Sequence, residues 1–222
     1  MNINIVLNID QIDSKTINRN LIDIVKTDNV LIQSDENSTF CNINNGDNDR
    51  LIIFGNIIGK TPEDIHQEFQ KSIPKYSIED FINKLEGRFV VVIISDNHCE
   101  ISCDRFARAD LYYTENSTGA IFSTSLSNFK NRFDGYNQVS ILYSLYIYGY
   151  RPPKKDTLYD GIHRLGVGEI AIWDDIKIHI KQSPPIISET EKYNDDQLNE
   201  YSDLLINSIN NCGSSNGNIV YL

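Results

Sequence analysis

The sequence predicts an α+β fold in which sheets are covered by a few helices. Two observations lead to this fold class. Apolar runs of strand length recur through most of the chain, and the helical segments do not alternate regularly with them. This order argues against a parallel βαβ array and favours a layered arrangement of sheets and helices.

The strand-like runs are separated by polar turns, many of which contain Asn, Asp or Gly. The run at 87–94 is almost wholly apolar, so both of its faces are expected to be buried. Strands are expected at residues 3–9, 50–59, 87–94 (which turns at 95–98 into a further strand) and 219–222, and hairpins at 29–44, 103–129 and 166–182.

The helical segments carry start signals. Thr61 is positioned as a cap with Pro62 at the first helical residue and acids in the first turn, and Ser77 is positioned as the cap of a second helix. Tyr143 and Tyr146 belong to a run of tyrosines that is expected to pack along a third helix, with a missing domain as one candidate for the surface they contact. The helices are expected at residues 61–73, 77–85, 137–150 and 196–210.

Composition narrows the function classes. The 222 residues carry a net charge of −11, which disfavours binding to the phosphates of nucleic acids. No apolar run approaches the roughly 20 residues of a membrane span, and the first residues lack the charge and cleavage pattern of a signal peptide. We therefore expect a cytoplasmic protein with no nucleic-acid or membrane partner.

The cysteines and histidines favour structural roles. Cys99 and Cys103 lie four residues apart on an expected strand, so their side chains share one face, too far apart to bind one metal ion. The other cysteines form no CxxC pair, and the four histidines are scattered. Buried thiols are the better interpretation, and we expect no metal site.

Four motifs in order resemble the glutamine-amidotransferase half of asparagine synthetases, whose relatives include β-lactam synthetases and lasso-peptide cyclases. They are "LEGRFVVVI", "DRFARADLYY", "AIFSTSLSNF" and "GIHRLGVGEIAIW". The corresponding family patterns are a Leu-x-Gly-x-Phe strand, an Asp-Arg-x-Gly-x-x-Pro-Leu-Tyr hairpin, a Ser-Glu-x-Lys strand end and a Leu-x-Pro-Gly turn. The matching structural positions are Gly87, Asp104, Arg105 and Tyr112. We interpret Asp104 and Arg105 as a charge-paired turn that fixes the hairpin start.

The resemblance implies a four-layer αββα sandwich of the N-terminal-nucleophile hydrolase type. Residues 1–182 would form the amidotransferase-like domain and 183–196 a linker. Residues 197–222 resemble the first helix and first strand of the family's ATP-pyrophosphatase (synthetase) domain, an α/β domain whose remainder is missing.

The groups that hydrolyse glutamine in this family are absent from the matching positions. The family requires an N-terminal cysteine as nucleophile, but position 2 is Asn2. Phe54 stands where the oxyanion-hole Asn would precede Gly55, which leaves a backbone N–H as the remaining donor. "SIPKYSIED" replaces the family's Gly-Ser-Asp-x-Glu segment, and Glu79 and Asp80 fit better as first-turn helix acids. No catalytic residue is therefore predicted.

The family's pyrophosphate loop, Ser-Gly-Gly-x-Asp-Ser, would follow the strand at 219–222 and does not occur in the sequence. We therefore expect no cofactor in this chain. ATP and Mg²⁺ are expected only with the missing synthetase domain, which would be the partner, in cis or as a separate chain.

Three functions stay open. The leading one is a degenerate, glutaminase-inactive amidotransferase-like domain of an ATP-dependent amide-forming enzyme. The second is a free-standing, non-catalytic binding module that reuses the fold. The third is an active hydrolase that matures by cleavage before Ser14, Thr16 or another residue.

Overall fold

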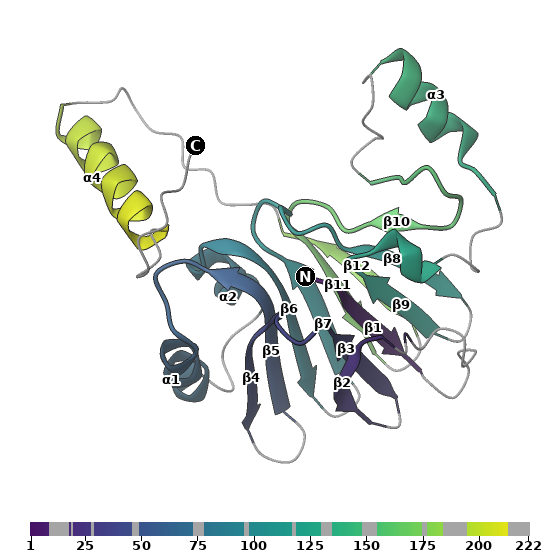
Figure 1. Cartoon of the computed structure of the whole chain (residues 1–222), viewed down its shortest axis with the longest axis horizontal. Helices are drawn as coiled ribbons and strands as arrows, with labels where there is room; N and C mark the ends of the chain where they lie inside the picture. Colours follow the sequence, from purple (N-terminus) through teal and green to yellow (C-terminus); the bar gives the residue numbers. More distant parts are fainter. Residues whose placement is uncertain are drawn as a thin grey trace.

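The computed structural model describes residues 1–8, 18, 20–27, 29–45, 49–72, 78–95, 98–116, 119–129, 135–147, 155–174, 177–183 and 195–212. These residues form two six-stranded sheets that lie face to face (Figure 1). Every strand pairing among them is antiparallel. The chain is therefore a mixed α/β protein with two antiparallel sheets and few helices, as the spacing of the strand runs predicts.

The first sheet places the N-terminal strand at its centre. Its order is β10 (His163–Arg164), β8 (Tyr112–Asn116), β9 (Gly119–Ser123), β1 (Ile3–Leu7), β3 (Val30–Ser34) and β2 (Ile22–Lys26).

The second sheet consists mainly of neighbours in sequence. Its order is β12 (Ile178–Gln182), β11 (Glu169–Trp173), β7 (His98–Cys103), β6 (Gly87–Ser95), β5 (Asp49–Ile57) and β4 (Thr39–Asn45). The hairpin expected at 29–44 is wrong, because β3 pairs with β1 and β2 in the first sheet, whereas β4 pairs with β5 in the second.

The main core lies between the two sheets. Alternate residues of β1, such as Ile3 and Ile5, meet residues of the second sheet such as Val90 and Val92. The intervening residues of β6, Phe89 among them, pack into a second core on the other face of that sheet. Both faces of β6 are therefore buried, which confirms the expectation for its apolar run.

Two helices cover the outer face of the second sheet (Figure 1). The helix α1 (Pro62–Ser72) begins as predicted, because the Thr61 hydroxyl accepts from the Asp64 amide at 3.3 Å and Asp64 accepts from the Thr61 amide at 2.8 Å. The helix α2 (Ile78–Lys84) follows, and its predicted cap at Ser77 lies outside the described residues. The outer face of the first sheet carries the 3₁₀ helix Leu126–Phe129, and the fourth layer of the sandwich stays a prediction.

Two further helices stand away from the sandwich (Figure 1). In α3 (Gln138–Tyr146) the Asn137 side chain accepts from the Ser140 amide at 2.9 Å, which caps the helix. Tyr143 and Tyr146 are exposed, Tyr146 by 82%, and their packing against a further domain stays a prediction. The helix α4 (Asp195–Cys212) also exposes its apolar side chains, and the strand expected at 219–222 lies outside the described residues.

No helix of the described residues has both the length and the apolar character to cross a membrane. The predicted boundaries at 182, 183–196 and 197 stay a prediction.

Three thiols lie in the cores. Cys99 and Cys103 share the core between the sheets, as their spacing predicts, and Cys41 lies in the outer core. Burial raises the pKa of Cys41 to about 12, against an opposing backbone hydrogen bond from Ile53. Burial also raises the pKa of Cys99 and Cys103, with a further contribution from neighbouring carboxylates.

These thiols predict that stability falls at alkaline pH. Unfolded thiols lose their protons above the ordinary value of 9.0 whereas the folded ones keep theirs, so the unfolded state binds fewer protons. Each thiol should then lower the free energy of unfolding by about 1.4 kcal/mol per pH unit above pH 9. Urea titrations from pH 8 to 10.5 measure this slope. In Cys41→Ala this slope should decrease by about 1.4 kcal/mol per pH unit, the contribution of one thiol. An unchanged slope would contradict the raised pKa of Cys41.

Candidate functional site

The start of β1 is held between the ends of β3 and β9. The Asn2 amide donates to Asp35 Oδ2 at 2.9 Å, and the Met1 amino group lies 3.8 Å from the same oxygen. On the other side, Thr124 Oγ1 accepts from the Ile3 amide at 3.0 Å and donates to the Met1 carbonyl at 3.2 Å. Asp35 also accepts a hydrogen bond from the Ser38 hydroxyl. This carboxylate therefore gathers three donors around the chain start.

The same end of the sandwich contains Gly55. A Cβ atom on Gly55 would lie 3.2 Å from the Met1 Sδ atom, so the structure brings two of the predicted positions, the chain start and the end of β5, into contact. The Gly55 amide donates to the Ser38 carbonyl at 2.8 Å. The backbone donor that sequence reasoning left at Gly55 is thus already engaged.

Phe54 points into the core between the sheets and is fully buried. Its ring has no hydrogen-bonding group, so this position offers no donor to a developing oxyanion. The Asn2 side chain is an amide and is not a nucleophile.

Two glycines, Gly55 on β5 and Gly87 on β6, lie where the backbones of these paired strands approach closely. We call this place the glycine crossing. Gly55 has φ +107° and Gly87 has φ +141°, both in the region that favours glycine. A Cβ on Gly55 would lie 2.3 Å from the Arg88 carbonyl oxygen, and a Cβ on Gly87 would lie 2.1 Å from the Asn56 carbonyl oxygen. The two backbones approach so closely that neither position has room for a side chain.

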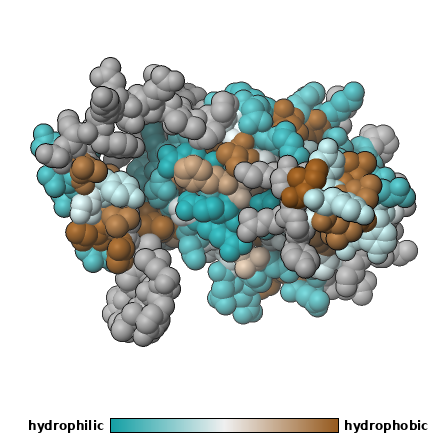
Figure 2. Space-filling model, turned by 90° about the horizontal axis from the view of Figure 1, so that it is seen from above, coloured by the Kyte–Doolittle hydropathy of each residue, from teal (hydrophilic) through white to brown (hydrophobic). Residues whose placement is uncertain are grey.

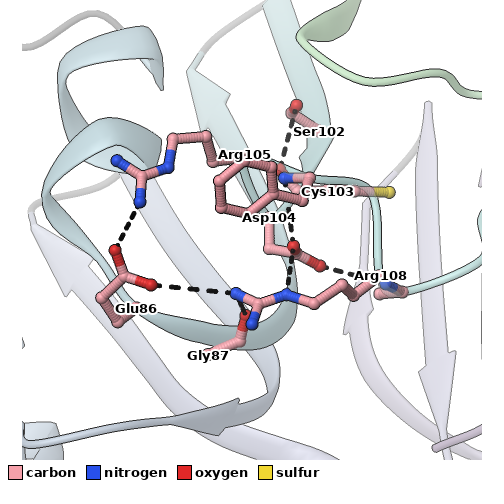
Figure 3. Close-up of polar contacts among 9 residues, drawn as sticks. Glu86, Gly87, Ser102, Cys103, Asp104, Arg105 and Arg108 are labelled. Carbon is pink, nitrogen blue, oxygen red and sulfur yellow. Dashed lines mark hydrogen bonds and ion pairs between the residues drawn. The ribbon is translucent and has the colours of Figure 1, made fainter. Parts of the chain in front are cut away.

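The loop after β7 is organised by the buried carboxylate of Asp104 (Figure 3). Asp104 Oδ2 accepts from the Ala109 amide at 3.0 Å, and Oδ1 accepts from the Phe106 amide at 3.2 Å and from Arg108 Nε at 3.1 Å. Arg108 also donates to the Gly87 carbonyl at 2.6 Å, which connects this loop to the glycine crossing.

The predicted pairing of Asp104 with Arg105 is wrong. Arg105 points away from Asp104 and donates to Glu86 at 2.6 Å, whereas Arg108 forms the ion pair with the buried carboxylate of Asp104 (Figure 3). Arg108, four residues after Asp104, reaches back over the loop to this carboxylate. Ala107, which occupies the glycine position of the family pattern, has φ +50°, a conformation that costs a non-glycine residue about 1–2 kcal/mol.

Tyr112 lies at the mouth of the hairpin, on β8. It is half-buried, and burial raises its pKa, with a further contribution from the Asp110 carboxylate. Arg164 on the neighbouring strand β10 pairs with Asp110 at 2.5 Å.

Among the described residues, no group of three or more His, Cys, Asp or Glu side chains is placed to hold a metal ion. The histidines have other contacts: His163 lies against the Tyr113 ring at 5.5 Å, and His98 contacts Glu100 at 2.9 Å. Glu79 pairs with Lys181 of β12, and the side chain of Asp80 lies outside the described part of the chain.

Sequence reasoning missed Asp35, Thr124 and Arg108. Asp35 and Thr124 reach the chain start only because β3 and β9 both pair with β1, and no local signal indicates those pairings. For Arg108 a signal exists, since "DRFAR" offers two arginines to one aspartate.

Solved structures of other proteins are similar to the chain at low sequence identity. No family model and no curated protein matches it. It is similar to a solved structure of glutamine phosphoribosylpyrophosphate amidotransferase from B. subtilis complexed with ADP and GMP, at 12% identity over 82% of this chain and 42% of that one, with a TM-score of 0.45. It is also similar to a structure described as the allosteric regulatory enzyme of purine biosynthesis, at 12% identity over 82% of this chain and 42% of that one, with a TM-score of 0.44. This chain spans less than half the length of either, and no residue role is carried over from them.

Proposed function

We propose that this chain is a degenerate amidotransferase-like domain that does not hydrolyse glutamine and that serves as the scaffold of an ATP-dependent amide-forming enzyme related to asparagine synthetases. The ordered motifs support the relationship. The observation that carries the loss of hydrolysis is the engaged Gly55 amide beside the buried Phe54 ring.

Hydrolysis of an amide needs a nucleophile and donors for the oxyanion. The chain start offers an asparagine amide, and the end of β5 offers an amide N–H that already donates to Ser38. Each missing oxyanion donor raises the barrier by about 3–4 kcal/mol, which is a factor of roughly 10²–10³ in rate. With both kinds of group missing, turnover falls below a useful rate.

The test is ammonia release from glutamine by the purified chain, together with labelling by a glutamine analogue that carries an electrophilic diazoketone. We expect no ammonia above the buffer background and no adduct. The Asn2→Cys variant restores a thiol and should still release none, because Phe54 and Gly55 still supply no donor. Ammonia release by the unchanged chain would refute the proposal.

The hydrolase alternative, with cleavage before Ser14 or Thr16, concerns positions outside the described residues. Intact mass measurement separates it from the proposal, since maturation by cleavage would remove the first 13 or 15 residues, whereas the proposal requires no such loss.

The partner that we propose is a synthetase-type domain, in cis or as a separate chain, and ATP and Mg²⁺ would bind to that domain. The exposed apolar side chains of α3 and α4 support it, and Figure 2 shows brown patches towards the two ends of the face where these helices lie. The described α3 residues include no charged side chain, and α4 carries Asp and Glu but no Lys or Arg. The complementary surface would be apolar against α3 and basic at the rim of α4.

A binding experiment tests the partner. Leu142→Glu and Leu145→Glu place charges on the exposed face of α3 without disturbing a buried contact. We expect the unchanged chain to co-elute with a synthetase-domain polypeptide from the same genome, and these variants to elute alone. Equal retention of all three would exclude α3 from the interface, and absence of any complex would favour the free-standing binding module.

A further inference from the structure

An open hollow lies beside the mouth of the β8–β9 hairpin, apart from the chain start. Its volume is about 190 Å³, below the roughly 300–1,000 Å³ of sites for drug-sized ligands, so it suits only a small ligand. Its lining residues are Tyr112, Leu126, Asp156, Thr157, Leu158, Tyr159 and Arg164. Two phenol rings and two leucines give it a largely apolar wall.

The wall is held in place by its own hydrogen bonds. The buried Thr157 hydroxyl contacts the carbonyls of Tyr159 and Ile162 at 3.0 and 2.8 Å and accepts from the Tyr159 amide at 3.1 Å. The Asn137 amide donates to the Leu158 carbonyl at 3.0 Å. A wall with these internal bonds does not need to be ordered by a ligand, which lowers the entropic cost of binding.

The charges around the hollow leave one carboxylate uncompensated. Arg164 is neutralised by Asp110 at 2.5 Å, and Lys155 forms its ion pair with the buried carboxylate of Glu169. Both described cations next to Asp156 therefore have other partners, and Asp156 forms no ion pair with any described residue. A half-buried carboxylate in an apolar hollow attracts a positive charge.

The aromatic rings of the hollow also favour a positively charged ligand. The negative face of a phenol ring attracts a cation within about 6 Å of its centre. The ring centre of Tyr136 lies 5.8 Å from that of Tyr159, and Tyr112 belongs to β8 of the first sheet. Leu126 and Leu158 would contact an aliphatic body attached to the cation.

We propose that this hollow binds an organic ammonium ion with an aliphatic body of several carbons, its charge between Asp156 and the rings of Tyr112 and Tyr159. The ion is either a free amine or the side chain of a lysine in a peptide, since both present the same head and chain. The inference goes beyond the proposed function, because it uses none of the residues at the chain start.

The experiment compares the binding of three probes of similar length to the full chain. Binding is measured by NMR, from the shifts of the tyrosine ring signals. Pentylammonium should bind saturably with a Kd on the order of 1 mM, as expected for so small a ligand, whereas pentanol and pentanoate should bind at least 10-fold more weakly. A short peptide with one lysine, compared with the free amine, distinguishes the two sources. Equal binding of pentanol, or tighter binding of pentanoate, would overturn the proposal without any variant.

Variants locate the binding. Asp156→Asn keeps the shape of the side chain and should weaken pentylammonium binding about 10-fold, and Tyr159→Leu should weaken it several-fold. Glu115→Gln is the matched control, because it removes the same charge from the exposed far end of β8 and should leave the Kd unchanged. Equal affinity of Asp156→Asn and Glu115→Gln would refute the site, and glutamine hydrolysis has no bearing on either result.

Discussion

Replacing Gly87 by alanine is expected to lower the free energy of unfolding by about 3–5 kcal/mol. The new Cβ would lie 2.1 Å from the Asn56 carbonyl oxygen and 2.9 Å from the Ile57 Cα atom. Both are backbone atoms of the paired strand β5, so no side-chain rotation relieves the overlap. The φ of +141° adds conformational strain for any residue with a Cβ. This loss is a large part of the 5–15 kcal/mol that stabilises a typical domain.

The matched control is Gly161→Ala. Gly161 also has a positive φ, +72°, but a Cβ atom added there would have no heavy atom within 4 Å, so strain of about 1–2 kcal/mol should be its whole cost. Urea unfolding of both variants measures the two losses. If Gly87→Ala costs no more than Gly161→Ala, the close approach of β5 and β6 does not limit this position.

Replacing Asp104 by alanine is expected to lower the free energy of unfolding by about 3–5 kcal/mol as well. The substitution leaves the Phe106 and Ala109 amides without their acceptor and removes the counter-charge of Arg108. The carboxylate is buried, so water does not readily replace it. Because Arg108 also donates to Gly87, the loosened loop should transmit part of the loss to the glycine crossing.

Two comparisons identify the cause. Asp104→Asn keeps an oxygen for Arg108 but places an NH₂ group against one of the amides, so its loss should be smaller than that of alanine. Asp160→Ala removes an aspartate whose oxygen accepts from the next amide, Gly161, in an exposed turn, and should cost below about 1 kcal/mol. A loss for Asp104→Ala as small as that for Asp160→Ala would show that the hydrogen bonds of the loop contribute little.

The features that sequence reasoning predicted well depend on local signals. The cap at Thr61, the apolar run of β6 and the shared face of Cys99 and Cys103 each follow from residues a few positions apart. The antiparallel hairpins follow from apolar runs on both sides of a polar turn.

The features that it could not predict depend on distant residues. The engagement of the Gly55 amide by Ser38 requires the irregular pairing of β4 with β5 near Thr39. The choice of Arg108 over Arg105 depends on the path of a loop with a left-handed alanine at its centre. The hollow beside Tyr112 forms only where β10 and residues 155–159 lie against the β8–β9 hairpin. No residue pattern within these segments predicts that arrangement.

The central position of β1 has a consequence for biosynthesis. Asn4 pairs with Gln33 on one side and with Ser123 on the other, so β1 leaves the ribosome long before its second neighbour is synthesised. At about 5–20 residues per second, that delay is on the order of ten seconds. During it the nascent chain presents an open, apolar strand edge to chaperones and to other chains, and the high contact order of the finished sheet places its folding among slow, millisecond-to-second reactions.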